Sequence, residues 1–333
     1  MSMLHVHNGD SSAGSLRSSG LPGEHLVWRE ALIAGPTPSG LSPDAWRAAR
    51  ATFLADGYGL SVSDCLNGLV EQEEALRRFK DHEEVILWFE HDLFCQTLLI
   101  YLLDWFSLTS LGKTKLSLIC INEFPGKPNF KGLGELSPEE MASLFESRHD
   151  VTDAELKLAS QAWAAYRSPN PKAIEELLDK DTSALPFLRE ALVSHLARFP
   201  SANNGLGRIE NKALELVNAG FSEFTSLFTQ FGQAEPIYGL GDSQFWNDLK
   251  RISEARHPLL IMEPLDVAQP LESRAFWMSS FKLTTAGEAV RSDKDDFVRL
   301  NGIDFWLGGV HLSDKGEVWR WHEEERRLTS TAS

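Results

Sequence analysis

A nearly continuous apolar run constrains the fold of this chain more than any other feature. The run is Glu84-Val-Ile-Leu-Trp-Phe89, and it lacks the alternation of apolar and polar residues that a half-exposed strand shows. An uninterrupted apolar strand is typical of a parallel sheet whose two faces are both covered. The run therefore predicts an α/β domain in which this strand lies inside the sheet.

Three more strand patterns occur in the N-terminal part of the chain, at residues 4–7, 25–28 and 115–121. Helical patterns separate the strands and begin at Ser15, at the cap Ser42 (with Pro43 in the first turn), at about Ser63, and after Asp92. Strands that alternate with helices imply right-handed crossovers and a parallel sheet. We expect a doubly wound, Rossmann-like α/β domain over residues 1–135.

The pattern changes to helices after residue 137. Helical periodicity over 139–148, 153–166, 172–178 and 185–199 predicts a helical region at 136–202, and Asn203-Asn-Gly-Leu-Gly207 reads as a linker. Three helices (208–219, 222–231, 243–255) and two strand-like segments (258–262, 281–290) follow. This order predicts a winged-helix-like α+β domain over 203–333, and Leu283-Thr-x-x-Gly287 resembles the wing strand of winged-helix regulators.

Composition restricts the class of partner. The formal net charge of −16 makes nucleic acid an unfavourable partner, because an acidic surface repels phosphate backbones. The cysteines Cys65, Cys95 and Cys120 are odd in number and far apart, which indicates reduced thiols and not a disulfide framework or zinc site. The sequence shows no secretory signal and no apolar stretch of membrane-spanning length. We expect a cytoplasmic protein that acts on a small molecule and has no membrane partner.

Polar residues follow each apolar strand of the predicted sheet. The four segments are Asn8–Gly14, Arg29-Glu30, Glu90–Asp92 and Asn122-Glu123. Ligands of open α/β sheets bind outside the carboxyl ends of the strands, where the strand order reverses, so a shared pocket is expected there. The predicted substrate-binding residues are Asn8, Gly9, Ser12, Arg29, Glu30 and Glu123.

The first of these segments is rich in small residues. They let backbone N–H groups approach a ligand, and the helix that follows offers an anion-favouring N-terminus. The strand followed by Gly9-Asp10-Ser11 resembles the first block of the Gly-Asp-Ser hydrolases, which implies a nucleophilic Ser11 and an oxyanion-stabilising loop amide. Their Gly-x-Asn-Asp and Asp-x-x-His blocks are absent from this chain. The alternative is that Asp10 and Ser11 only cap the helix.

Three ionisable residues, Glu90, His91 and Asp92, follow the most apolar strand. His91 is a candidate general acid or base that Glu90 or Asp92 orients; the alternative is that Asp92 caps the next helix. His5 and His7 have the spacing of strand-borne metal ligands, but a histidine within a strand is more often part of the core. We therefore predict no metal and no cofactor, with Ser11, Asp10, Glu90, His91 and Asp92 as catalytic residues.

Four longer segments resemble a bacterial family described only as domain of unknown function 1835. They are Leu4-His-Val-x-Asn-Gly-Asp-Ser-x-Ala-Gly-Ser-Leu16, Leu87-Trp-Phe-Glu-His-Asp-Leu93, Asp181-Thr-Ser-Ala-Leu-Pro-Phe187 and Gly302-Ile-Asp-x-Trp-Leu-Gly-Gly-Val-His-Leu312. The resemblance spans nearly the whole chain, and it implies no established activity.

The sequence favours an enzyme, a hydrolase or a lyase, that uses acid–base or nucleophilic chemistry. The alternative is a ligand-sensing transcriptional regulator whose C-terminal domain contacts DNA. The candidate recognition helix carries Lys250 and Arg251 but also Asp248 and Glu254, whereas sequence-specific binding usually needs a basic face. A third reading is that the C-terminal domain packs over the pocket or forms a homodimer.

Overall fold

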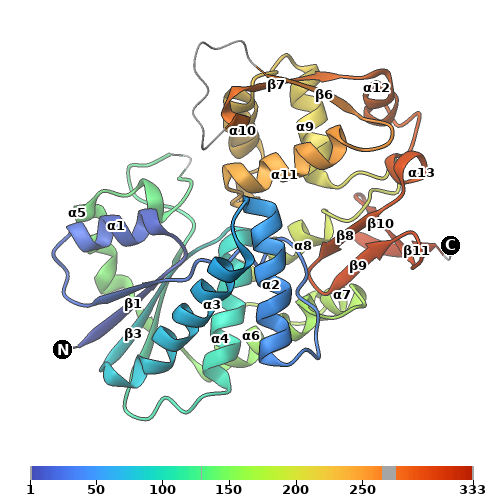
Figure 1. Cartoon of the computed structure of the whole chain (residues 1–333). Helices are drawn as coiled ribbons and strands as arrows, with labels where there is room; N and C mark the ends of the chain where they lie inside the picture. Colours follow the sequence, from blue (N-terminus) through green and yellow to red (C-terminus); the bar gives the residue numbers. More distant parts are fainter. Residues whose placement is uncertain (1, 129, 265–274, 332–333) are drawn as a thin grey trace. The chain divides into compact units, whose positions relative to one another are not determined.

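The computed structural model describes residues 2–128, 130–264 and 275–331 (Figure 1). It divides the chain into two compact units. Unit 1 comprises the chain up to Leu192 together with Gly308–Val310, and unit 2 comprises Val193–Leu307 and the chain from His311 onward. The passage from one unit to the other lies within helix α8 (Leu188–Leu196).

Unit 1 is built on a five-stranded sheet. Its strands are β1 (Met3–His7), β2 (Glu24–Val27), β3 (Glu84–Glu90), β4 (Lys115–Ile121) and β5 (His149–Asp150). Their order is β2-β1-β3-β4-β5, and every pair is parallel except β4–β5. The prediction of an α/β domain with a parallel sheet is confirmed for β1 to β4, whereas the short antiparallel edge strand β5 carries no signal in the sequence.

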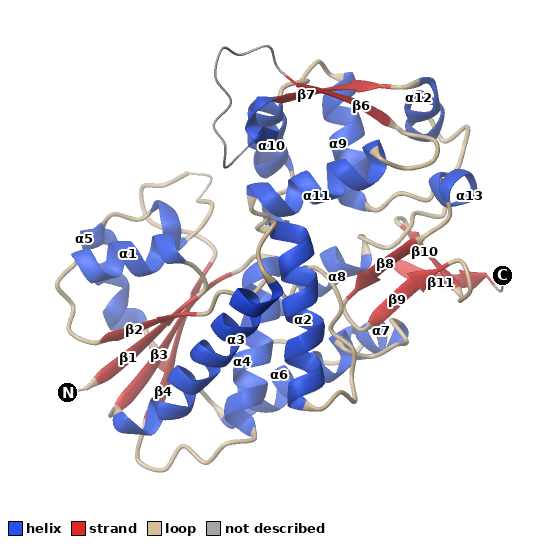
Figure 2. Cartoon of the chain, in the orientation of Figure 1, coloured by secondary structure: helices blue, strands red, loops and turns tan. Residues whose placement is uncertain are grey.

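Helices cover both faces of this sheet (Figure 2). One face carries α1 (Asp10–Ser18) and α5 (Pro138–Ser143), with the short 3₁₀ turns η2 (Leu133–Glu135) and η3 (Leu144–Ser147). The other carries α2 (Pro43–Tyr58), α3 (Val62–Arg77), α4 (Leu93–Ser107) and α6 (Asp153–Tyr166), with η1 (Arg78–Asp81) and α7 (Lys172–Leu178) nearby in the chain. This double cover explains why all seven residues of β3 are buried.

The alternation of side chains along the strands decides which residues reach the α1 face. Met3 of β1, Ile86 and Trp88 of β3, and Ile119 of β4 pack there in one apolar cluster with Leu16, Phe130, Leu133, Leu136 and Met141. Because successive strand residues point to opposite faces, Glu90 lies on the same face as Trp88, at the carboxyl end of the strand. The sheet thus directs one buried acid towards α1.

The described residues of unit 2 are mainly helical and include three two-stranded pairs. Its helices are α9 (Arg208–Asn218), α10 (Phe224–Ala234), η4 (Pro236–Tyr238), α11 (Asp242–Ser253), η5 (Ala275–Met278), α12 (Thr285–Arg291) and α13 (Phe297–Asn301). The strand pairs are β6 (Leu260–Pro264) with β7 (Ser279–Leu283), β8 (Asp304–Leu307) with β9 (Val310–Ser313), and β10 (Val318–His322) with β11 (Arg327–Thr331). Of these, β6–β7 and β10–β11 are antiparallel. Within the described residues, every helix is too short or too polar to cross a membrane.

Two local expectations differ from the structure. The segment expected to be a loop before a helix at Ser15 is helical from Asp10, because Gly9 adopts the extended N-cap conformation and Asp10 suits the positive end of the helix. The Leu283-Thr-x-x-Gly287 element is not a wing strand throughout. Strand β7 ends at Leu283, and the Thr284 side chain caps α12 by accepting a hydrogen bond from the Gly287 amide.

Candidate functional site

The candidate site lies where the strand order of unit 1 reverses. After β1 the chain adds β2 on one side and then β3 on the other, so β1 and β3 are neighbours although β2 separates them in sequence. His7 and Trp88 are paired at the carboxyl ends of these strands, which brings Asn8 and Glu90 together. This is the edge at which open α/β sheets bind their ligands.

Asn8 joins the ends of the two strands through hydrogen bonds. Its amide nitrogen donates to Glu90 Oε1 at 3.1 Å and lies 3.0 Å from Cys95 Sγ, while its Oδ1 accepts from the Ser12 hydroxyl at 3.0 Å. Both amide protons and the amide oxygen of Asn8 are therefore used within the protein. Within the protein, Asn8 thus holds Glu90 and Cys95 in place, and its substrate-binding role stays a prediction.

The Glu90 carboxyl group is buried and accepts a second, shorter hydrogen bond. The backbone amide of Leu133 donates to the same oxygen, Oε1, at 2.7 Å. Burial and the nearby charge of Asp92 raise the pKa of Glu90 to about 8, against the opposing effect of the hydrogen bonds from Leu133 and Asn8. The raised pKa favours the protonated form of Glu90, and the hydrogen bonds from Leu133 and Asn8 hold the acid in a fixed orientation.

Asp92 is the N-cap of helix α4, which is one of the two roles expected from the sequence. It also lies beside Glu90, so the two carboxyl groups form a buried acidic pair. Its side chain accepts a hydrogen bond from the backbone amide of Cys95 at 2.9 Å and so caps α4. Burial raises the pKa of Asp92, and it raises the pKa of the Cys95 thiol well above its usual value. Such a buried, protonated thiol is unreactive as a nucleophile.

The ligand atoms of Glu90, Asp92 and Cys95 lie within 4.8 Å of one another, the one such group of three in the described parts of the chain. The set is close enough for one metal ion, but one oxygen of each carboxyl group and the Cys95 sulfur already have partners. Glu90 Oε1 accepts two N–H donors, Asp92 caps α4, and Cys95 Sγ contacts the Asn8 amide. These contacts suit a proton-sharing acid pair better than an open coordination site.

Asp10, Ser11 and Arg29 lie at the exposed rim of this cluster. Arg29 forms a two-pronged ion pair with Asp10 (2.6 and 3.0 Å), and both side chains are about two-thirds exposed. The Ser11 hydroxyl donates to the carbonyl oxygen of Gly134 at 3.1 Å. Neither Asp10 nor Ser11 caps α1 with its side chain, and the hydrogen bond of Ser11 goes to a carbonyl oxygen and not to a catalytic base.

The remaining predicted residues are placed less uniformly. Glu30 is buried and forms an ion pair with the fully buried Arg50 at 2.6 Å, so its carboxylate is engaged within the fold. Glu123 is exposed beyond the end of β4 and takes no part in the Asn8–Glu90 network. The ring of His91 is half-buried, packs edge-on against Phe187, and has no hydrogen-bond partner for its buried Nδ1 among the described residues.

His5 and His7 belong to a buried aromatic cluster. The ring of His25 stacks on those of His5 and His7, and Trp88 packs beside them. Trp88 Nε1 donates to His5 Nδ1 at 3.1 Å, so the proton of His5 is on Nε2, which donates to the Pro22 carbonyl. The cluster packs the α1 face of the sheet, as expected of histidines within a strand.

Three residues of the site were missed by sequence reasoning. Cys95 could have been found, because it lies three residues after the helix cap Asp92 and therefore on the first helical turn. Gln96 donates to the backbone carbonyl of Glu90 at 2.7 Å, and its place on the same turn is an equally local signal. Leu133 has no such signal, because it contacts Glu90 through its backbone amide and from 43 residues away.

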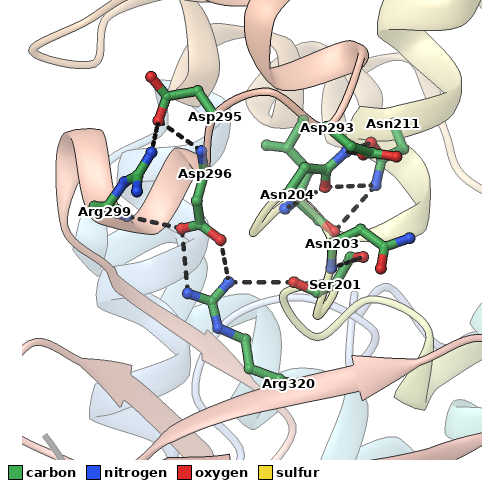
Figure 3. A network of polar contacts seen from close by, with 10 residues as sticks. Ser201, Asn203, Asn204, Asn211, Asp293, Asp295, Asp296, Arg299 and Arg320 are labelled. Atoms are coloured by element: carbon green, nitrogen blue, oxygen red, sulfur yellow. Dashed lines mark hydrogen bonds and ion pairs between the residues drawn. The ribbon is translucent and has the colours of Figure 1, made fainter.

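Unit 2 contains a second polar network (Figure 3), which supports the backbone. Arg320 forms two hydrogen bonds to Asp296, and Asn204 bonds to Asn211 and Asp293. Residues 204–207 are buried, so the segment expected to be a linker is instead packed into unit 2. Because these charged and amide groups form hydrogen bonds with one another, we infer that the network stabilises the fold of unit 2.

The comparisons with known proteins add no family to this description. No model of a known protein family matches the chain, and no curated protein matches it.

Proposed function

We propose that unit 1 is the catalytic part of an enzyme that acts on a small molecule by acid–base or nucleophilic chemistry, in a hydrolysis or lyase step without a cofactor. The observation that carries the proposal is the buried pair of Glu90 and Asp92 at the reversal of strand order. Two adjacent carboxyl groups in a dry environment titrate as a unit. Acids with shifted pKa values of this kind are concentrated at catalytic sites.

Glu90 supplies the acid in this proposal. Its Oε1 accepts hydrogen bonds from Leu133 and Asn8, so the proton of the carboxyl group belongs on Oε2. A pKa of about 8 keeps that proton in place at neutral pH, which is the state a general acid needs. The charge of Asp92 is a main reason for the raised pKa, and Asp92 is the partner in the shared titration.

The exposed rim supplies substrate contacts. Arg29 is a cation for an anionic substrate, which would replace Asp10 as its partner, since an exposed ion pair costs little to open. Ser11 acts as a hydrogen-bonding group, because its hydroxyl donates to the Gly134 carbonyl oxygen and, among the described residues, to no base. His91 follows Glu90 directly and is the candidate base, because imidazole is the group that most often accepts protons in catalysis.

A ligand-sensing transcriptional regulator is the second candidate. Helices α9, α10 and α11 precede the antiparallel pair β6–β7, which is the order of elements in a winged-helix domain. Arg251 of α11, however, is paired with the buried Glu210, and Lys250 has Glu254 beside it on the same helix. A helix that carries acidic residues among its cations lacks the basic face of a recognition helix, so the enzyme is preferred. The resemblance to domain of unknown function 1835 stays a prediction.

The test is a thermal-shift screen of the full chain against small metabolites, aromatic acids, nucleotides and divalent metals. The screen is repeated with Glu90→Gln and Asp92→Asn, which keep the shape of the side chains and remove the titrating groups. Glu71→Gln, at an exposed position of α3, is the matched control. We expect a compound that stabilises the wild type and Glu71→Gln and loses its effect in the two site variants. A compound that stabilises all four proteins equally would contradict the proposal.

A further inference from the structure

One short turn contacts two of the predicted catalytic residues from outside their own elements. It consists of Gly132, Leu133 and Gly134, hereafter the Gly132–Gly134 turn. The Leu133 amide donates to Glu90 Oε1 at 2.7 Å, and the Gly134 carbonyl oxygen accepts from the Ser11 hydroxyl at 3.1 Å. The turn therefore connects the end of β3 with the first turn of α1.

Gly132 is required by its close approach to Glu90, and Gly134 lies in tight contact with the exposed Ser11 side chain. A Cβ atom at residue 132 would lie 2.2 Å from Glu90 Oε2, and Gly132 has a φ of +151°, where side chains are rarely tolerated. A Cβ atom at residue 134 would lie 3.1 Å from Ser11 Oγ. Glu90 thus occupies the space that a side chain at residue 132 would need, whereas Ser11 would have to shift by only a few tenths of an ångström for one at residue 134.

The Leu133 side chain fixes the turn to the elements that carry these residues. Leu133 is fully buried in the apolar cluster that includes Leu16 of α1 and Trp88 of β3. In such a close-packed core, a change in side-chain volume of even one methylene group disturbs the neighbouring residues. The turn, the start of α1 and the end of β3 consequently form one packed assembly around the acid.

We propose that the Gly132–Gly134 turn is a positioning element of the site, in which the Leu133 amide orients the Glu90 carboxyl group and the Gly134 carbonyl orients the Ser11 hydroxyl. The assignment rests on the proposed function, because that function makes Glu90 and Ser11 the groups whose orientation matters. Oε1 is thereby kept as the acceptor, and Oε2 is left to carry the proton. The turn is a positioning element and touches no reacting atom through its own side chains.

The test compares two glycine substitutions, one whose new Cβ atom meets the Glu90 carboxyl group and one whose new Cβ atom meets nothing. Gly132→Ala forces a Cβ against the Glu90 carboxyl group, whereas Gly126→Ala, also at a positive φ (+80°), meets no heavy atom within 4 Å. The titration of Glu90 is followed by infrared difference spectroscopy of its carboxyl band, identified by its loss in Glu90→Gln. Because the Leu133 hydrogen bond lowers the pKa of Glu90, its loss raises the midpoint. We expect a rise of about one pH unit, a tenfold change in proton affinity, in Gly132→Ala only.

A folded Gly132→Ala protein with the wild-type midpoint would overturn the proposal. If this variant fails to fold, the wild-type chain still provides a test. With nitrogen-15-labelled leucine, the Leu133 amide resonance should shift with pH at the midpoint of Glu90 and lose that shift in Glu90→Gln. A Leu133 resonance that does not follow the Glu90 titration would also overturn the proposal. Neither readout depends on a substrate. If the thermal-shift screen contradicts the proposed function while the Leu133 amide still follows the Glu90 titration, only the proposed function is refuted and the positioning role of the turn stands.

Discussion

The amide nitrogen of Asn8 donates a hydrogen bond of 3.1 Å to Oε1 of Glu90, although the two residues are 82 positions apart in the chain. The contact exists because β1 and β3 are neighbours in the sheet and end at the same edge. It ties the first residue after one strand to the last residue of the other. The acid at the centre of the proposed site is thus oriented by the sheet topology itself.

Replacement of Asn8 by Ala should destabilise the chain and make Glu90 a weaker acid. The variant loses two donors and one acceptor in a buried network, which costs about 1–3 kcal/mol in free energy of unfolding. Because the Asn8 hydrogen bond lowers the pKa of Glu90, that pKa should rise. Urea unfolding at neutral pH measures the stability. Asn67→Ala, exposed on α3, is the control, and an equal loss in both variants would contradict the account.

Substitutions of Asp92 should separate its capping part from its charge. Asn is as good a helix cap as Asp, so Asp92→Asn should keep α4 intact, whereas Asp92→Ala should lose about 1 kcal/mol in free energy of unfolding. Since the charge of Asp92 raises the pKa of Glu90, both variants should lower that pKa. The titration of Glu90 in each variant checks this. An unchanged midpoint in Asp92→Asn would show that the two carboxyl groups are not coupled.

Two arginines that pair with predicted site residues, Arg50 with Glu30 and Arg29 with Asp10, should respond very differently to removal. Arg50 is fully buried and binds Glu30 together with three backbone carbonyls, so Arg50→Met leaves a buried carboxylate unpaired and should cost about 3–5 kcal/mol. Arg29→Met breaks an exposed pair and should cost at most about 1 kcal/mol. Urea unfolding of both variants tests the contrast. Equal costs would mean that Arg29 is structural and is not free to meet a ligand.

The histidine cluster should make unit 1 sensitive to acid. Burial lowers the pKa values of His5, His7 and His25, to about 2 for His7 and about 4 for His25. The unfolded chain takes up these protons below about pH 6.5 while the folded chain does not, so stability falls as the pH falls from there towards about 4. Each histidine contributes a slope of at most about 1.4 kcal/mol per pH unit.

The difference between the wild type and His7→Gln isolates this effect from that of the carboxylates. The free energy of unfolding should depend less steeply on pH in the variant over the same window. His257→Gln, at an exposed position of unit 2, should keep the wild-type slope. A His7→Gln protein with an unchanged slope would mean that His7 is not a source of the acid sensitivity.

The parts of the fold that the sequence predicts are those with strong local patterns. The apolar run of β3 and the cap Ser42 followed by Pro43 each specify their element within a few residues, and α2 begins at Pro43 as expected. The start of α1 was misplaced because its small polar residues resemble a loop. They form a helical turn because Gly9 provides the N-cap and Ser12 bonds back to Asn8 and Gly9.

The sequence predicts the site residues that lie at the ends of strands. It does not predict those that contribute through a backbone group or through the packing of a distant helix. Glu90 ends strand β3 and Asp92 lies just beyond it, so both could be named in advance. Glu30 follows a strand too, but its pairing with Arg50 depends on how α2 packs, which no pattern in the sequence specifies. Leu133 contributes an amide that every residue but proline possesses, so its part in the site becomes visible only in three dimensions.

The pH titration of the Glu90 carboxyl group tests the central claim most directly. The infrared carboxyl band that is absent in Glu90→Gln is followed in the wild-type chain from acid to alkaline pH. The account predicts that this band persists at neutral pH and disappears with a midpoint of about 8, as expected of a buried acid beside a second carboxyl group. A midpoint near the ordinary glutamate value of about 4.3 would show that Glu90 is ionised at neutral pH, and the proposed general acid would not exist.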